Sequence, residues 1–198
     1  MVTRRGPIAI HGAREVYDNP WISLTQHDVS AVSTGRAFSY TVVHFKKTAT
    51  GVVPLHDDGT VTLVGQHRFP FDAYSWELPE GGAEPEEAPL DAIKRELAEE
   101  AGLAGADWRQ ILHMHLSNSV TDENCFVYLA TGLSPASAEA DDTEDLTIRR
   151  MPFAEALAMC ADGRITDAIT ISGLMRVHHM AVRGELPDGL NDMIAEKR

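Results

Sequence analysis

Hydrophobic residues recur every three or four positions over residues 90–101, a spacing typical of a helix with one buried face. The apolar positions on this face are Leu90, Ile93, Leu97 and Ala101. Pro89 stands where the first turn of a helix tolerates proline, and Gly102 stands where a left-handed glycine commonly ends one. We therefore expect a helix over residues 90–101.

Runs of β-branched and aromatic residues predict strands on both sides of this helix. Strands are expected within 15–28, with a break at Asn19-Pro20, and over 38–46, 48–53, 61–65, 111–116, 125–130 and 146–151. The Asp-Gly pair at 58–59 predicts a tight hairpin turn. Two further helices are expected, one after Pro152 and one from about Thr166, while residues 1–14 are expected to be a loose leader. This order favours an α/β fold, in which helices pack on a mixed sheet.

Composition and charge restrict the class of protein. With 198 residues, of which 43% are hydrophobic, the chain can bury a core as one domain with a smaller subdomain. Its formal net charge of −13 argues against nucleic acid as a partner, because nonspecific binding of nucleic acid needs a basic surface. No run of about 18 apolar residues predicts a membrane span. The basic N-terminus lacks the apolar stretch of a secretory signal, and two cysteines are too few for a disulfide framework, so we expect a cytoplasmic protein.

Three glutamates on the expected helix are the first candidates for chemistry. Glu96, Glu99 and Glu100 have the spacing i, i+3, i+4 and therefore share one helix face. Like charges at this spacing destabilise a helix. They form either a solvated acidic surface or a site for a hard divalent cation such as Mg²⁺, which prefers oxygen ligands and keeps waters and phosphate oxygens in its shell.

The loop before the helix adds two features. Gly81-Gly82 allows the backbone to approach a ligand or the helix closely, because glycine has no side chain to collide. Glu87 precedes Arg95 by eight residues, so a loop carboxylate can fold back onto the helix. A bidentate pair between Glu87 and Arg95 would pin the loop to the helix.

Together these residues resemble the signature of the Nudix family. That signature is Gly, five residues, Glu, seven residues, then Arg-Glu-apolar-any-Glu-Glu-any-Gly-apolar. Here Gly81 and Glu87 are followed by the run RELAEEAGL over residues 95–103, and every fixed position matches. The resemblance implies an α/β/α sandwich with a mixed sheet, a bound divalent cation, Mg²⁺ or Mn²⁺, and hydrolysis of a nucleoside diphosphate linked to another group.

The resemblance also implies roles for individual residues. Glu96 and Glu100 match the principal metal ligands, Glu99 an assisting one, and the backbone carbonyl of Glu80 a further one. Glu99 and Arg95 are placed in the catalytic set, Arg95 through its pair with the loop.

Segments outside the signature resemble one branch of the family, the ADP-ribose and nucleotide-sugar pyrophosphatases. They are residues 64–70, 76–82, 144–146, 152 and 163–167. In this branch the residue matched by Arg68 contacts the diphosphate and the one matched by Glu77 lies in the active site. A loop glutamate acts as general base, for which Glu144 is the best match and Glu139 and Asp145 are rivals. Trp21 either stacks on the nucleobase or lies in a core or an interface.

One departure bears on the substrate. The ADP-ribose subgroup often carries a proline about fifteen residues after the signature, where this chain has Asn118-Ser119. This favours a broader hydrolase of nucleoside diphosphate sugars, of the ADP-ribose or GDP-mannose type. The alternatives are a hydrolase of dinucleoside polyphosphates or nucleoside triphosphates, and a non-catalytic ADP-ribose-binding sensor.

The same branch suggests a division of the chain and a partner. Residues 1–50 are expected to form an N-terminal β subdomain that is exchanged across a homodimer. Residues 51–183 would form the Nudix domain, and residues 184–198 a loose C-terminal tail.

Overall fold

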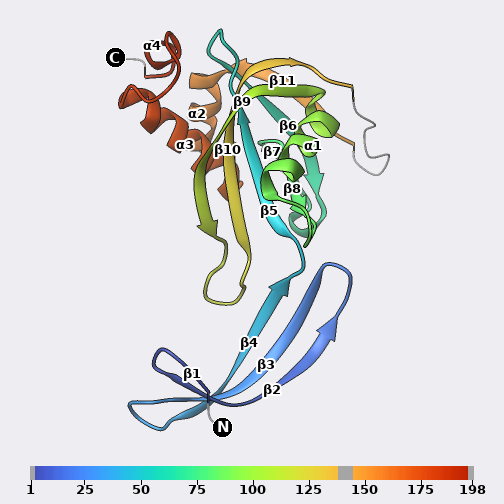
Figure 1. Cartoon of the computed structure of the whole chain (residues 1–198), viewed down its shortest axis with the longest axis vertical. Coiled ribbons are helices and arrows are strands. Elements are labelled where there is room, and N and C mark those ends of the chain that lie inside the picture. Colours follow the sequence, from blue (N-terminus) through green and yellow to red (C-terminus); the bar gives the residue numbers. More distant parts are fainter. Residues whose placement is uncertain (1–2, 138–144, 196–198) are drawn as a thin grey trace. The chain divides into compact units, whose positions relative to one another are not determined.

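The structure is a computed structural model, and it describes residues 3–137 and 145–195 (Figure 1). The first elements in chain order are β1 (Thr3–Arg5), β2 (Ile8–Asp18), β3 (Ile22–Ala31), β4 (Ala37–Phe45), β5 (Thr48–Pro54), β6 (Thr60–Arg68), the 3₁₀ turn η1 (Phe69–Phe71), β7 (Ala73–Glu77) and β8 (Glu80–Ala83). They are followed by α1 (Pro89–Ala101), β9 (Leu103–His115), β10 (Asn124–Pro135), β11 (Thr147–Pro152), α2 (Phe153–Asp162), α3 (Ala168–Val182) and α4 (Leu190–Ile194). Among the described helices, none combines the length and apolarity needed to cross a bilayer.

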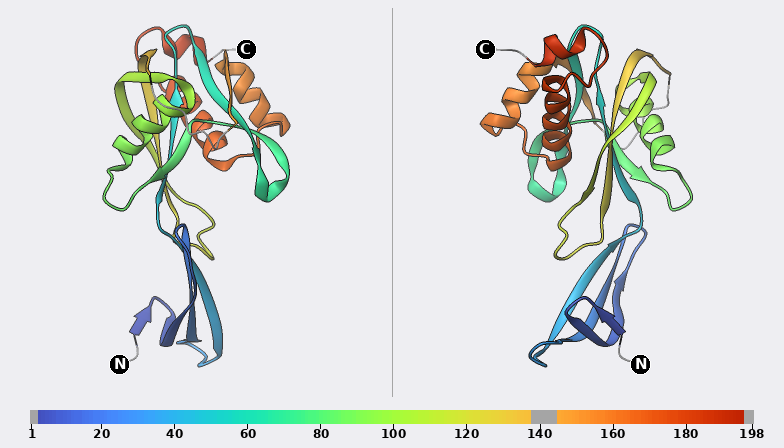
Figure 2. Two further views of the ribbon diagram at one scale, coloured as in Figure 1. Left: turned by 90° about the vertical axis from the view of Figure 1, so that its right-hand side faces the viewer. Right: turned by 60° about the vertical axis from the view of Figure 1, so that its left-hand side comes forward.

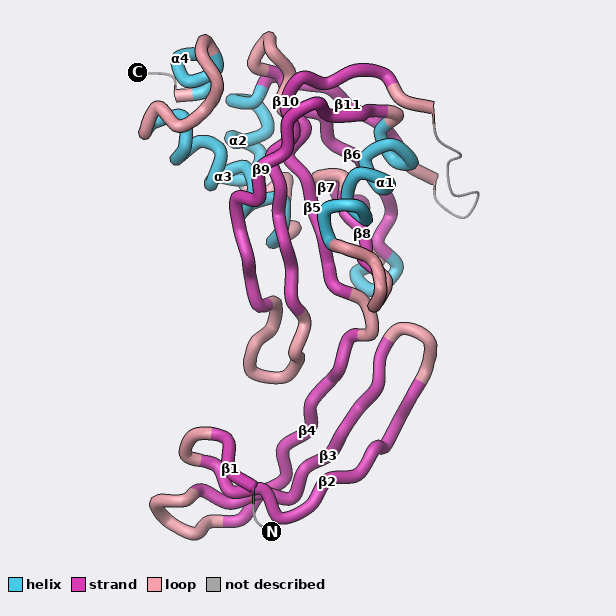
Figure 3. Tube along the Cα trace, in the orientation of Figure 1, coloured by secondary structure: helices cyan, strands magenta, loops and turns pink. Residues whose placement is uncertain are grey.

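Two compact units make up the chain, and the first contains the residues up to Thr48 together with residues 115–124. Its sheet has the order β1-β2-β3-β4, and each strand runs antiparallel to the next (Figure 3). Residues 115–124 lie along the edge of this sheet, where Val43 bridges Thr121 and the His44 imidazole contacts the Asp122 carboxylate.

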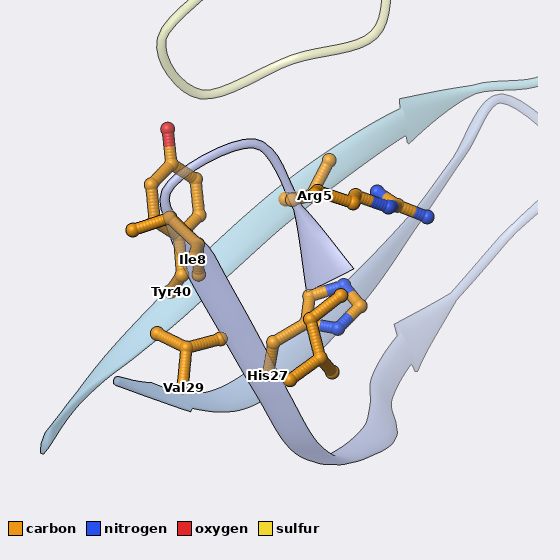
Figure 4. A pocket seen from close by; sticks show the side chains of 7 residues that line it. Arg5, Ile8, His27, Val29 and Tyr40 are labelled. Carbon is orange, nitrogen blue, oxygen red and sulfur yellow. The ribbon is translucent and has the colours of Figure 1, made fainter. Parts of the chain in front are cut away.

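The first unit has little core of its own. Of its described hydrophobic residues, Ala9 and Val29 are buried, whereas Trp21 is 65% exposed. One face of the sheet is hollowed into a cavity of about 270 Å³ (Figure 4). The cavity is lined by Arg5, Ile8, Ile10, His27, Val29, Tyr40 and Val42. A sheet of this kind needs a second layer to cover its apolar face.

The second unit contains two sheets, with strand orders β8-β5-β10-β9 and β11-β6-β7. β5 and β10 run parallel, whereas β6 pairs antiparallel with both β7 and β11. Parallel and antiparallel pairing are therefore combined, as the sequence predicts for a mixed sheet.

Helices cover both faces of the β5-β10 pair (Figure 2). Val52 and Tyr128 pack in one cluster with Ile93 and Leu97 of α1. Successive side chains of a strand point to opposite faces. The next residue of β5, Val53, accordingly lies against α3, where a Cβ at Gly173 would come within 3.2 Å of it. This helix–sheet–helix layering confirms the expected α/β sandwich.

The expected helix over residues 90–101 is confirmed as α1. Pro89 occupies its first turn, and Gly102 ends it with a φ of 63°. The Asp-Gly turn before β6 is also present, with Gly59 at a φ of 78°.

Two expectations at the chain ends are wrong. Residues 3–14 of the expected leader form β1 and most of β2, because their backbone is paired in an antiparallel ladder. The tail expected to be loose from Gly184 contains α4, which packs against α3 and buries Leu190 and Ile194. The predicted division at residue 50 stays a prediction, and the first unit also takes in residues 115–124.

We expect Leu97→Ala to lower the free energy of unfolding by about 2–5 kcal/mol, because it leaves a cavity in the cluster under α1. Leu97 is fully buried there. Urea denaturation followed by circular dichroism measures the change. Met175→Ala, on the exposed side of α3 at 46% exposure, is the control and should change stability by less than about 0.5 kcal/mol. Equal effects of the two variants would contradict this view of the core.

Candidate functional site

Glycine at position 81 leaves room for the Glu96 side chain beside β8. A Cβ built on Gly81 would lie 2.2 Å from the carboxyl carbon of Glu96, so a larger residue would displace this carboxylate. The Glu96 carboxylate therefore lies directly against the β8 backbone. Thr50 of β5 donates a hydrogen bond to the Gly81 carbonyl (3.1 Å) and fixes this backbone from the other side.

Arg95 is the cation around which the carboxylates of α1 gather. Its Nη1 donates to both Glu96 and Glu99, at 2.9 Å each, and its Nε and Nη2 donate to the two oxygens of Glu87 at 3.3 Å. Hydrogen bonding to Glu87, followed by the charges of its other partners, raises the pKa of Arg95. The expected pair between Glu87 and Arg95 is present and attaches the loop to the helix.

A second arginine organises the strands on the other side of the site. Arg68, at the end of β6, donates to both oxygens of Glu77 at 2.6–3.1 Å, and its Nη2 also reaches Glu80 at 3.2 Å. Glu77 is 3% exposed and accepts a further hydrogen bond from Gln66. A charge-assisted bidentate pair of this kind fixes the direction of the guanidinium.

Glu80 and Glu100 meet where β8 begins. The Glu80 amide donates to the Glu100 carboxylate at 3.0 Å, and Glu100 is 6% exposed. Among the described residues, Glu80 Oε2 is buried and has no hydrogen-bond partner. Burial, and then the charges of Asp167 and Glu77, raise the pKa of the Glu80 carboxyl well above its ordinary value.

The donor atoms of this site are of the type that a hard divalent cation binds. Carboxylate oxygens from β7, β8 and α1 gather around two arginines, and oxygen is the donor that Mg²⁺ and Mn²⁺ prefer. The buried Glu80 oxygen that lacks a partner is the kind of atom a cation satisfies. In their present conformations, no three of the described His, Cys, Asp or Glu side chains are arranged to coordinate one metal ion. Glu96 and Glu99 are turned toward Arg95, so an ion would have to draw them away.

The remaining predicted residues belong to other segments of the chain. Trp21 is in the turn between β2 and β3 of the first unit, where its amide donates to the Asn19 side chain. Glu144 and its rival Glu139 lie outside the described residues, and Asp145 is exposed.

Asp167 and Thr170 were not among the residues predicted from the sequence. Asp167 caps α3, because its carboxylate accepts a hydrogen bond from the Thr170 amide at 2.7 Å. Its negative charge also contributes to the raised pKa of both Glu80 and Arg68. The sequence marks Asp167 as a helix start, but no local pattern reveals what that helix end faces.

Comparison with known proteins finds relatives in sequence and in fold. The family model described as NUDIX domain matches residues 45–171. An ADP-ribose pyrophosphatase of Mycobacterium tuberculosis is 36% identical over 140 residues, which cover 69% of this chain and 67% of the relative. A GDP-mannose pyrophosphatase of Pectobacterium atrosepticum is 31% identical over 139 residues, covering 66% and 70%. The crystal structure of an ADP compounds hydrolase superposes with a TM-score of 0.81 at 22% identity and covers 93% of this chain and 100% of the other.

The raised pKa of Glu80 predicts how stability depends on pH. Folding raises this pKa above the ordinary 4.5, so the folded chain holds the proton more tightly than the unfolded chain. The contribution of Glu80 to stability is therefore fully present below about pH 4.5 and is lost as the pH rises through the raised value. Glu80→Gln removes this loss and keeps an oxygen acceptor for Arg68. In EDTA we expect the variant to melt above the wild type at pH 8 and to lose that advantage at pH 5.

Thermal unfolding at the two pH values measures the difference. Glu86→Gln, which removes an exposed carboxylate of the neighbouring loop, is the control and should follow the wild type at both. Parallel pH profiles for Glu80→Gln and the wild type would show that Glu80 does not carry the shifted proton.

Proposed function

This chain belongs to the Nudix family and is a Nudix hydrolase, and from this premise we propose that it hydrolyses the diphosphate bond of a nucleoside diphosphate sugar. The substrate would be of the ADP-ribose or GDP-mannose type, and the products a nucleoside monophosphate and a sugar phosphate. The observation that carries the proposal is the complete signature from Gly81 to Leu103, whose carboxylates gather at the start of β8 and on α1. The similarity to pyrophosphatases that are named for ADP-ribose and GDP-mannose supports the substrate class.

Glu96 and Glu100 would hold Mg²⁺ or Mn²⁺, with Glu99 assisting and the Glu80 carbonyl as a further ligand. When bound, such a cation neutralises diphosphate oxygens and lowers the pKa of a bound water. The need for it follows from charge, because a chain with a formal net charge of −13 otherwise repels an anionic substrate.

Arg68 would bind the diphosphate. Its side chain is 37% exposed although Glu77 holds it on one side, so part of the guanidinium can meet a phosphate oxygen. Glu77 would contribute to substrate binding through Arg68, because its own oxygens are buried and paired. Arg95 would act in the same indirect way, by setting the positions of Glu96 and Glu99.

Glu144 would serve as general base, taking a proton from the attacking water. Trp21 would stack on the nucleobase, which suits an aromatic side chain that is 65% exposed. We further propose a homodimer and a cytoplasmic location. The poorly buried sheet of the first unit supports the dimer, since its apolar face needs a covering layer.

We expect Glu100→Gln to lower turnover at least about a hundredfold, because it removes a ligand charge from the site while an oxygen acceptor remains for the Glu80 amide. The assay measures product release from ADP-ribose, GDP-mannose, UDP-glucose, Ap4A and dGTP, each with Mg²⁺, with Mn²⁺ and with EDTA. Release of AMP or GMP from the first two substrates, abolished by EDTA, is the expected result.

Glu86→Gln is the matched control, because it removes an exposed carboxylate from the same segment, and it should keep full turnover. Near-normal turnover by Glu100→Gln would overturn the ligand role. If the wild type releases product only from Ap4A or dGTP, it is a hydrolase of another nucleotide class. Binding of ADP-ribose without any turnover would identify a sensor.

The proposed dimer has a direct test. Light scattering after size exclusion should give twice the chain mass of 21.7 kDa at micromolar concentration. Replacing Ile10 and Val42, which line the cavity on the apolar face, by serine should shift the mass toward one chain, because a partner that covers this face loses its apolar contacts. A wild type with the mass of a single chain would contradict the homodimer.

A further inference from the structure

The connection Leu78–Pro79 between β7 and β8 carries a carboxylate of the site on each side. Glu77 precedes it and Glu80 follows it, and both pair with Arg68. The position of this short connection therefore decides where the Arg68 guanidinium lies.

Three hydrogen bonds hold the connection, one to each of three elements. They are Val52 N to Pro79 O for β5, Glu80 N to Glu100 Oε2 for α1, and Leu78 N to Thr170 Oγ1 for α3, at 3.0, 3.0 and 2.8 Å. The first two belong to the central sheet and to the signature helix. The third comes from a helix far along the chain, to which the signature gives no role.

The bond between Leu78 and Thr170 is enclosed, because both residues are fully buried. A buried amide without an acceptor is costly, so the Thr170 hydroxyl is a demanding partner for the Leu78 amide. Thr170 is held in turn by Asp167, whose carboxylate accepts a hydrogen bond from the Thr170 amide. Asp167, Thr170 and Leu78 thus form a continuous chain of hydrogen bonds.

Packing reinforces this chain of contacts. A Cβ built on Gly173, one turn further along α3, would lie 2.8 Å from a methyl carbon of Leu78. Helix α3 therefore contacts Leu78 at two points, through the Thr170 hydroxyl and at Gly173. A displacement of the α3 N-terminus is transmitted to the connection.

We infer that Asp167 and Thr170 are positioning residues of the hydrolase site, which act through the Leu78 amide to hold Glu77, Glu80 and hence Arg68 in place. The inference rests on the proposed function, because it needs Arg68 to meet the substrate. Neither residue touches the substrate in this account. Both act by fixing a connection on which two carboxylates depend.

Thr170→Val tests the link, because it keeps the branched shape and removes the acceptor. We expect kcat for the preferred nucleoside diphosphate sugar to fall about tenfold to a hundredfold and KM to rise, because Arg68 and the Glu80 backbone would be misplaced relative to the diphosphate. Thr170→Ser keeps the hydroxyl and should restore kcat. Exchange of the Leu78 amide with deuterium should be about tenfold faster in Thr170→Val than in the wild type.

Asp167 is tested by a second pair of variants. Asp167→Asn keeps a capping acceptor and should retain most of kcat, whereas Asp167→Ala should lose about as much as Thr170→Val. Val177→Ala is the control for simple loss of stability, because Val177 is buried in the same helix but has no part in this chain of contacts. It should lower the melting temperature and leave kcat unchanged in the folded enzyme.

The outcomes separate the two proposals. An active wild type in which Thr170→Val keeps full kcat, or in which Val177→Ala loses as much, overturns the positioning role and leaves the proposed function standing. A wild type without turnover of any nucleoside diphosphate sugar overturns the proposed function, and the positioning role falls with it.

Discussion

Repulsion among closely placed carboxylates is the constraint on which this site depends. Glu96, Glu99 and Glu100 share one face of α1, and Glu80 is buried beside them with a raised pKa. Arg95 on one side and Arg68 on the other offset part of this charge through multiple short contacts. The arginines hold the acidic groups in a compact arrangement, and the remaining negative charge suits a divalent cation. The carboxylates that repel one another in the folded chain are thus also the groups that suit a divalent cation, which can in turn bind phosphate oxygens.

Close backbone approach makes this crowding possible. Gly81 leaves room for the Glu96 carboxylate, and Gly51 leaves room for Ile169, whose methyl group would lie 2.7 Å from an added Cβ. Gly173 does the same for Leu78. Each of these glycines leaves room for a side chain of the neighbouring layer. The positions of the charged side chains in the site therefore depend on how closely the helices pack on the strands.

The sequence predicts the parts of this arrangement that are local. Helix α1 follows from its apolar period, its first-turn proline and its terminal glycine, and the pair of Glu87 with Arg95 follows from their spacing. The pair of Arg68 with Glu77 depends on the antiparallel register of β6 and β7, in which Glu77 lies opposite Val64. No pattern within either strand specifies that register. The roles of Asp167 and Thr170 depend on a contact across 92 positions of the chain. The sequence does not predict β1 or residues 8–14 of β2 for a related reason, since glycines and a proline interrupt their pattern and only pairing between strands defines them.

The alternation of β5 has a consequence for how this protein can change over evolutionary time. Val52 faces α1 and Val53 faces α3, so a single inserted or deleted residue in this strand would exchange the two faces and present each helix with the wrong surface. Length variation in the central strand is therefore disfavoured, whereas the connections at the ends of the strands can lengthen or shorten without disturbing the layers. New substrate preferences would then arise by changes in the loops, while the strand residues that face each helix stay the same. Val52 and Val53 thus show why the length of β5 is constrained and the length of the loops is not.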